Sequence, residues 1–203
     1  MKNYTTILLV LLTLTFSCSK DDDKSPTPVQ QFDGSEEAIE NFFSAEVLDA
    51  MDELGFPVNE GTAPPIINGE YLISPLEAIA SNIDGDLIGK IYSDANVTFS
   101  NQSNETMTVD VVEIQGGSNS VAEQSFISGS ANSFSVFVKL ANTGNGHTRI
   151  LAVAYSGFLS ESGIQNFQSV LIMLDDKGDP NNDLIENGQG RLFKDSDEIS
   201  PKQ

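Results

Sequence analysis

The sequence predicts a mainly β protein: an antiparallel up-and-down barrel of about eight strands preceded by one α-helix. Between residues 64 and 198, apolar residues recur with a period of two, the spacing of a strand with one buried face. Short turns such as Gly144-Asn145-Gly146 join these segments, so neighbouring strands run antiparallel. Closing a long meander into a barrel removes its two exposed edges. A β-sandwich is the alternative.

Residues 1–17 have the organisation of an export signal. Lys2 supplies the positive start, and the apolar run from Thr6 to Phe16 is too short for a membrane-spanning helix, which needs ~20 residues. The run ends in Leu14-Thr15-Phe16-Ser17-Cys18, which resembles a bacterial lipobox. The resemblance implies that Cys18, the only cysteine in the chain, carries a lipid and becomes the mature N-terminus. An ordinary signal peptide with an incidental cysteine is the alternative.

Residues 18–34 are expected to form an acidic, flexible tether. The segment contains the run Lys20-Asp21-Asp22-Asp23-Lys24 and two prolines, with almost nothing apolar before Phe32. Cys-Ser followed by a short acidic run resembles the surface-displayed lipoproteins of the Bacteroidota. This resemblance implies a protein anchored in the outer membrane and exposed at the cell surface. A soluble spacer is the alternative.

One helix is predicted over residues 35–57. Ser35 or Asp33 can cap its first turn, and Gly55 followed by Pro57 ends it. Apolar residues recur three or four apart on one face. This stripe consists of Ile39, Phe43, Val47, Met51 and Leu54. The simplest way to bury it is against a mouth or flank of the barrel, and recruitment of a partner protein is the alternative.

The barrel domain is predicted to extend over residues 64–198. Its strands are expected at residues 69–74, 87–99, 106–115, 121–128, 133–142, 148–159, 166–174 and 189–194. Between the first two of these strands, Ser74 and Pro75 indicate a short helical turn. The connections are short and contain no other helix, which favours a meander over a parallel sheet.

The two ends of the predicted meander resemble lipocalins and their calycin relatives. Those proteins begin their first strand with Gly-x-Trp and carry an arginine on the last strand that stacks over the aromatic ring. This chain has Gly69-Glu70-Tyr71 at the start and Arg191 at the end. The resemblance implies that Tyr71 and Arg191 pack together and close the barrel.

The same resemblance implies that the barrel binds a small, partly apolar ligand. A closed barrel of this size either fills its interior with side chains or leaves room for one small molecule. Residues that can line such a site are Tyr92, Phe99, Met107 and Phe134, together with Val109 and Val136.

Charge and motifs argue against several other functions. Ten Lys and Arg stand against thirty Asp and Glu, giving a net charge of −20, and no basic patch for nucleic acid is visible. His147 is the only histidine, and no nucleophile motif or phosphate loop accompanies it, so no enzymatic activity is expected. A non-enzymatic surface adhesin or assembly module is the alternative to ligand binding.

One acidic segment has the spacing of a calcium loop. Asp179, Asn181 and Asp183 alternate as oxygen ligands do in many such loops. No other cofactor is expected. Because Asp and Asn also form ordinary turns, a plain connecting loop is the alternative.

The lipid anchor can be tested by replacing Cys18 with alanine. Each buried methylene of an acyl chain contributes about 0.8 kcal/mol, so losing the lipid should release the protein from the membrane. Fractionation and incorporation of labelled fatty acid measure this, with Ser25→Ala in the tether as the control. A Cys18→Ala variant that keeps both label and membrane association would contradict the lipobox.

Overall fold

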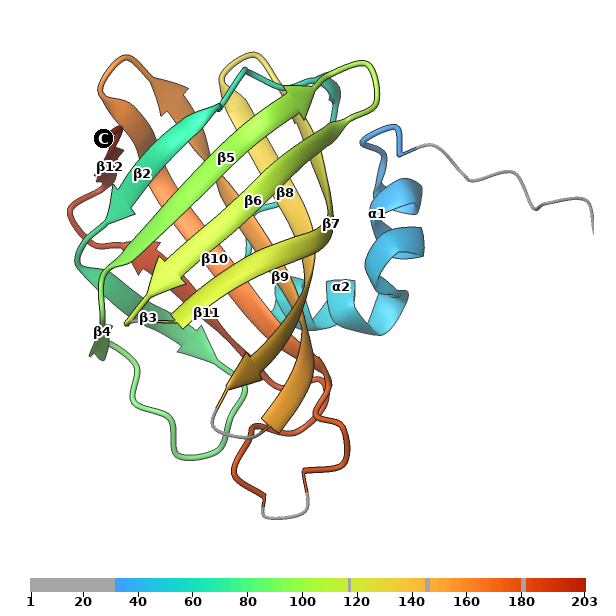
Figure 1. Ribbon diagram of the computed structural model, residues 1–203, viewed down its shortest axis with the longest axis vertical. Coiled ribbons are helices and arrows are strands. Elements are labelled where there is room, and N and C mark those ends of the chain that lie inside the picture. Colours follow the sequence, from blue (N-terminus) through green and yellow to red (C-terminus); the bar gives the residue numbers. More distant parts are fainter. Residues whose placement is uncertain (1–31, 117, 145–146, 180–181) are drawn as a thin grey trace, which may run out of the picture.

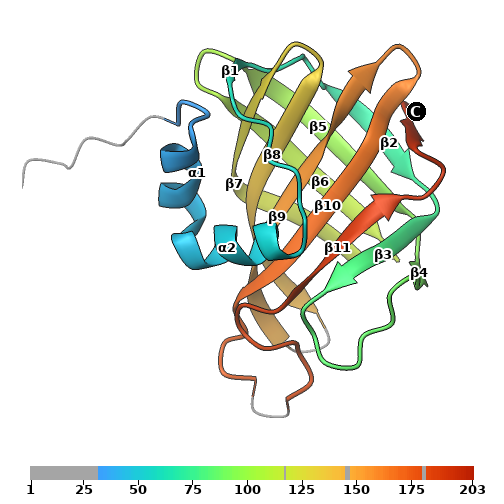
Figure 2. The same cartoon turned by 180° about the vertical axis from the view of Figure 1, so that it is seen from behind.

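The computed structural model describes residues 32–116, 118–144, 147–179 and 182–203. This part of the chain forms one curled, barrel-like sheet with two helices on its outer side (Figures 1 and 2). All pairings are antiparallel except that of β1 with β7. The strands are β1 Thr62–Ala63, β2 Gly69–Ile73, β3 Leu76–Ser81, β4 Ile91–Tyr92, β5 Ala95–Ser103, β6 Thr108–Gln115, β7 Ser118–Ser130, β8 Ser133–Gly144, β9 His147–Ser160, β10 Gly163–Asp175, β11 Gly190–Asp195 and β12 Ile199–Pro201.

The two ends of the sheet are connected by the chain itself. Neighbouring strands follow the order β2-β5-β6-β7-β8-β9-β10-β11-β3-β4, with β1 beside β7 and β12 beside β10. β2 pairs with β5 and β3 pairs with β11, yet only Ser74 and Pro75 separate β2 from β3. The bent segment β2–β3 therefore pairs with β5 at one end of the sheet and with β11 at the other. It brings these two ends together as the sheet curls.

The expected antiparallel, mainly β fold is confirmed, but the strand count was too low. The described residues contain twelve strands in a single sheet, not about eight, and no sandwich of two sheets. β1, β4 and β12 have two or three residues each, too few for a periodic pattern to reveal them. The helical turn expected after Pro75 is also wrong, because Leu76 and Ala78 alternate into the interior as β3.

Two helices replace the single helix predicted over residues 35–57. α1 spans Glu36–Phe43 and α2 spans Ala45–Glu53, and they lie at a clear angle to each other (Figures 1 and 2). Ser35 caps α1 by accepting a hydrogen bond from the Ala38 amide at 3.2 Å. The break is at Ser44, whose φ of 104° is uncommon for a residue with a Cβ. Burial of apolar residues on both helices offsets this local cost.

The apolar stripe of the helices covers a flank of the sheet. It packs against the outer faces of β7 to β11 in a cluster with Phe137, Ala154, Val170 and Leu192. Phe32 stacks on Phe126 with ring centroids 4.5 Å apart, so the segment before α1 joins the same cluster. The stripe is thus buried within this chain, as expected, and the central strands are apolar on both faces.

Hydrogen bonds of Asn59, the Asn59 clamp, hold the segment between α2 and β1 against this outer face of the sheet. The Asn59 side-chain amide donates to the Phe134 carbonyl at 3.0 Å and to the Ser156 hydroxyl at 2.9 Å. The Ser128 hydroxyl donates to the Asn59 carbonyl at 2.6 Å. Since buried polar groups are costly without partners, these bonds account for the buried Ser128 and Ser156.

Two phenylalanines provide a matched test of this packing. Phe137 on β8 is 0% exposed beneath the helices, whereas Phe158 on β9 is 45% exposed. Phe137→Ala should lower the free energy of unfolding by about 3–5 kcal/mol, because it leaves a cavity, and Phe158→Ala should cost much less. Urea unfolding measures both. Equal losses would contradict the docking of the helices on this flank.

Candidate functional site

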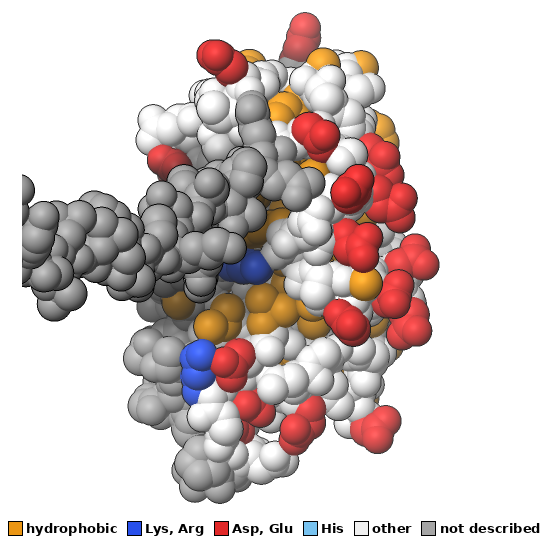
Figure 3. Space-filling model, turned by 90° about the vertical axis from the view of Figure 1, so that its right-hand side faces the viewer, with side chains coloured by type: hydrophobic (Ala, Val, Ile, Leu, Met, Phe, Trp, Pro, Cys, Tyr) orange, Lys and Arg blue, Asp and Glu red, His pale blue; other side chains and the backbone are white. Residues whose placement is uncertain are grey.

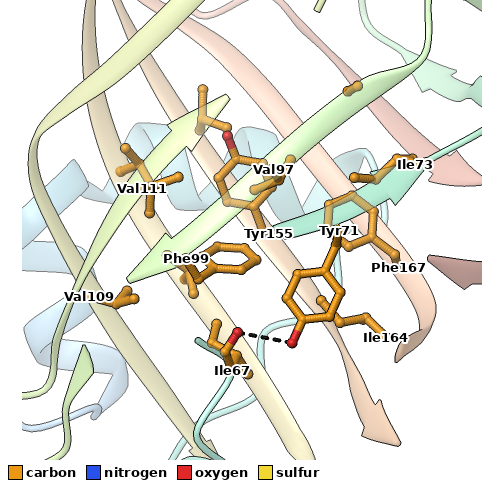
Figure 4. Packing of buried hydrophobic residues seen from close by; sticks show 14 of the residues in the cluster. Ile67, Tyr71, Ile73, Val97, Phe99, Val109, Val111, Tyr155, Ile164 and Phe167 are labelled. Atoms are coloured by element: carbon orange, nitrogen blue, oxygen red, sulfur yellow. Dashed lines mark hydrogen bonds between the residues drawn. The ribbon is translucent and has the colours of Figure 1, made fainter. Parts of the chain in front are cut away.

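One half of the interior is filled by aromatic side chains. Tyr71, Phe99, Tyr155 and Phe167 lie against one another, with the Phe99 and Tyr155 ring centroids 5.8 Å apart in an edge-to-face contact (Figure 4). All four are at most 1% exposed. These rings give this half of the sheet a packed core.

The segment before β2 closes this filled end. Ile67 is fully buried, and its carbonyl accepts a hydrogen bond from the Tyr71 hydroxyl at 3.0 Å (Figure 4). The Gln102 side chain fixes the segment by accepting from the Ile67 amide and donating to the Pro65 carbonyl, both at 2.8 Å. These three hydrogen bonds hold the segment in place at the filled end of the sheet.

The other half encloses a cavity of about 230 Å³. It lies toward the lower end of the sheet in Figure 1, where β6 ends, β7 begins and the chain enters β9. Most of its lining residues are apolar, with Leu76, Tyr92, Val97, Leu140, Leu151, Phe167 and Phe193 among them, but polar atoms make up about half of the wall surface. The polar members include Glu113, Gln115, Ser120, Arg149, Ser169 and Arg191. A concave wall that combines apolar side chains with convergent polar groups is typical of small-molecule sites.

Glu113 is the carboxyl group of the cavity wall. It extends the inward alternation of Val109 and Val111 along β6, and its Oε2 accepts a hydrogen bond from the Tyr155 hydroxyl at 2.7 Å. Burial raises the pKa of Glu113 above its usual range, although the bond from Tyr155 acts in the opposite direction. Burial also raises the pKa of Tyr155, and the neighbouring Glu113 adds to this shift. The pair therefore favours the neutral form of both groups.

Arg191 ties the loop between β3 and β4 to the same end of the sheet. Its Nε and Nη2 donate to the two carboxylate oxygens of Asp86 at 2.6 and 3.0 Å, and the Ser81 hydroxyl donates to Asp86 at 2.7 Å. The hydrogen bond from Arg191 is the main reason that the pKa of Asp86 is lowered. Both side chains remain about one-fifth exposed, so the pair mainly positions the loop.

Arg149 stands on β9 in line with three interior residues, Leu151, Val153 and Tyr155. It borders the cavity, and its Nε is buried without a hydrogen-bond partner in the described part of the chain. A buried donor without a partner is unusual, because its desolvation is not compensated.

Of the four predicted ligand-binding residues, only Tyr92 lines the cavity. Phe99 and Phe134 belong to the filled half, with ring centroids 6.2 Å apart. Met107 lies outside the sheet in the cluster beneath the helices. Met107 lies on that side because the β5–β6 connection contains positive φ values at Asn101 and Met107, which break the alternation.

The expected contact between Tyr71 and Arg191 is replaced by other partners. Tyr71 packs on Phe99 and bonds to Ile67, whereas Arg191 pairs with Asp86. The reason is topological, because β3 rather than β2 is the neighbour of β11. Of the two residues, only Arg191 borders the cavity.

Sequence reasoning missed Glu113 and Arg149. Each is a charged residue at an inward position of a strand that is otherwise apolar on that face. The alternation of β6 and β9 identifies both positions as inward, but only after the inward face of each strand has been assigned.

The proposed calcium ligands lie in the loop between β10 and β11, of which Asn181 lies outside the described residues. The Asp179 carboxylate accepts a hydrogen bond from the Leu184 amide at 2.6 Å. This bond helps position Leu184, which packs with Ile185 against the interior cluster. Within the described chain, no three His, Cys, Asp or Glu residues are grouped to hold a metal ion. Calcium binding stays a prediction.

Cys18, the signal peptide and most of the tether also lie outside the described residues, so lipidation stays a prediction. His147 begins β9, and its side chain is not described. Across the described ranges, neither helix has the length and apolar character needed to cross a membrane.

Comparisons of the chain with protein-family models, curated proteins and solved structures gave no match. Function has therefore to be inferred from the sequence pattern and from the chemistry of the cavity.

Glu113 gives a testable dependence of stability on pH. Because its pKa is raised in the folded state, the folded protein keeps a proton that the unfolded chain loses near its usual pKa of about 4.3. Stability should therefore fall as pH rises from that value through the raised pKa, by about 1.4 kcal/mol for each unit of the shift. Glu113→Gln should lack this fall.

Urea unfolding between pH 4 and 8 measures the effect as the difference between the variant and the wild-type protein, which cancels the general repulsion of an acidic chain. Glu70→Gln, at an exposed position of β2, is the control and should follow the wild-type curve. Parallel curves for Glu113→Gln and wild type would show that burial of Glu113 has no energetic effect.

Proposed function

We propose that this protein is a cell-envelope lipoprotein that binds a small, partly apolar molecule in the cavity at one end of its curled sheet. The observation that carries the proposal is the contrast between the two halves of the interior. One is filled by aromatic rings, whereas the other contains a cavity of about 230 Å³ lined by both apolar and polar side chains. Pockets for drug-sized ligands measure roughly 300–1,000 Å³, so this cavity suits a smaller molecule.

A lipocalin-like architecture fits this role. If the bent segment β2–β3 is treated as a single strand, it and the seven strands from β5 to β11 surround the interior in a closed order. Eight strands lie at the size where a barrel is either filled or holds one small ligand. Two departures from the resemblance are the helices on the flank and the pairing of Arg191 with Asp86.

The proposed location is the outer membrane, with a lipid on Cys18 and the domain displayed at the cell surface. This part of the proposal rests on the resemblance of residues 1–24 to surface lipoproteins. Phe32, the first described residue, lies on the outer flank against Phe126, whereas the cavity lies inside the sheet. The anchor and the binding site would thus be on separate parts of the domain.

We propose binding rather than catalysis. The sequence has no recognisable nucleophile motif, and the carboxyl group of the cavity, Glu113, is already engaged by Tyr155.

An interaction module is the second candidate. A groove between the helices and the segment after α2 has Ile39, Leu48 and Phe56 in its wall and Asp49 and Asp52 beside them. Acidic side chains predominate among the charged ones on the face shown in Figure 3. Both features would suit a basic partner, and this groove becomes the leading candidate if the cavity binds no small molecule.

The ligand-binding role can be tested with 1-octanol as a probe of the cavity. Ala95 is buried in the cavity wall, and Ala95→Leu should fill part of the space. We expect calorimetry to show that the wild-type protein binds 1-octanol and that Ala95→Leu, which adds three carbon atoms, binds it at least about tenfold more weakly, since one extra methylene in an apolar pocket can already have this effect.

Ala141→Leu is the matched control, because Ala141 is exposed on β8 and does not line the cavity. It should bind as the wild-type protein does. Equal affinities of Ala95→Leu and Ala141→Leu would place binding outside the cavity and contradict the proposal.

A further inference from the structure

Both arginines of the chain line the cavity. The sequence contains only Arg149 and Arg191, against eight lysines and thirty acidic residues. Both side chains are partly buried, and burying a guanidinium is costly unless it is paired. In a chain of net charge −20, the presence of both arginines at one interior site calls for a chemical reason.

For Arg191 that reason lies within the chain. Asp86 accepts from two of its nitrogens, and the same carboxylate also accepts from Ser81. This bidentate pair uses one edge of the guanidinium and balances its charge. Arg191 therefore has a structural role in holding the loop between β3 and β4.

Arg149 has no equivalent partner. No ion pair joins it to any side chain that the structure describes, and its buried Nε makes no hydrogen bond there. Its position on β9, two residues before Leu151, directs it toward the cavity that it lines. Within the described chain, the cavity thus contains one guanidinium that has no ion-pair partner and whose buried Nε–H is unbonded.

The carboxyl group in the wall, Glu113, is not the partner of Arg149. Glu113 accepts its hydrogen bond from the Tyr155 hydroxyl, and no ion pair joins it to Arg149 in the described part of the chain. The remaining wall consists of apolar residues, hydroxyls and an amide. Among the described residues, therefore, no side chain supplies a negative charge to Arg149.

We propose that the ligand is a small organic anion with a single carboxylate-type head group, which Arg149 binds. This inference rests on the proposed ligand-binding function and specifies its chemistry. A guanidinium matches a carboxylate with two parallel N–H···O bonds, and the apolar body of the ligand packs against Leu76, Leu151 and Phe193. Because only one of the two arginines is unpaired, the site recognises one anionic group.

Three probes with the same hydrocarbon chain and different head groups test this proposal. Calorimetric titration of the purified protein with octanoate, 1-octanol and octylamine compares an anion, a neutral molecule and a cation. We expect octanoate to bind at least about tenfold more tightly than 1-octanol, because hydrogen bonds to a charged partner are the stronger ones, and octylamine to bind most weakly.

Variants then assign the preference to one side chain. Arg149→Gln should remove the preference for octanoate while leaving 1-octanol affinity within about threefold, and Arg149→Lys should retain part of it, because the charge remains without the planar fork. Lys194→Gln is the matched control: it removes one positive charge from the partly exposed Lys194 on β11, which does not line the cavity. It should keep the wild-type preference.

Two results would overturn the inference alone: equal binding of octanoate and 1-octanol by the wild-type protein, or an unchanged preference in a folded Arg149→Gln variant. The first comparison needs no variant, so it decides the question even if Arg149→Gln does not fold. Failure of all three probes to bind would overturn the proposed function as well.

Discussion

The enclosed interior depends on the bend between β2 and β3. Because this segment pairs with β5 on one side and β11 on the other, both ends of the sheet are satisfied by the same stretch of chain. The bend is held from outside, since the Pro75 carbonyl accepts hydrogen bonds from the Ser196 amide and hydroxyl at 3.0 and 3.1 Å. Without it, β5 and β11 would present unpaired edges, which favour association with other chains.

The two faces of the sheet have different tasks. The inner face provides an aromatic core at one end and a cavity at the other, whereas the outer face of the central strands supports the helices. Residues that alternate along β8, such as Val136 and Phe137, are therefore both fully buried. The Asn59 clamp extends this outer layer with a polar contact, so the helices and the segment after them form part of the domain rather than an addition to it.

Sequence patterning predicted the long strands well because each buries at least one apolar face, and it placed the helical region correctly. It could not predict the break at Ser44, because the apolar spacing from Ile39 to Leu54 continues through that residue. Nor could it assign the inward face, since Phe99 and Met107 look equally suitable in the sequence and lie on opposite sides of the sheet. Arg191 was recognised as important, but its partner Asp86 lies in a loop whose position no local pattern reveals.

The aromatic core also acts as a floor for the site. Phe167 borders the cavity and packs against Tyr155, which in turn contacts Phe99, so the space ends at a layer of rings that a ligand cannot pass. Closely packed side chains such as these rings cannot move aside for a ligand without lowering the stability of the fold. A molecule whose head group is fixed at the side of the cavity can extend only as far as this layer. The domain would then discriminate among related molecules by length, and longer members of a series would have to leave part of their chain in water.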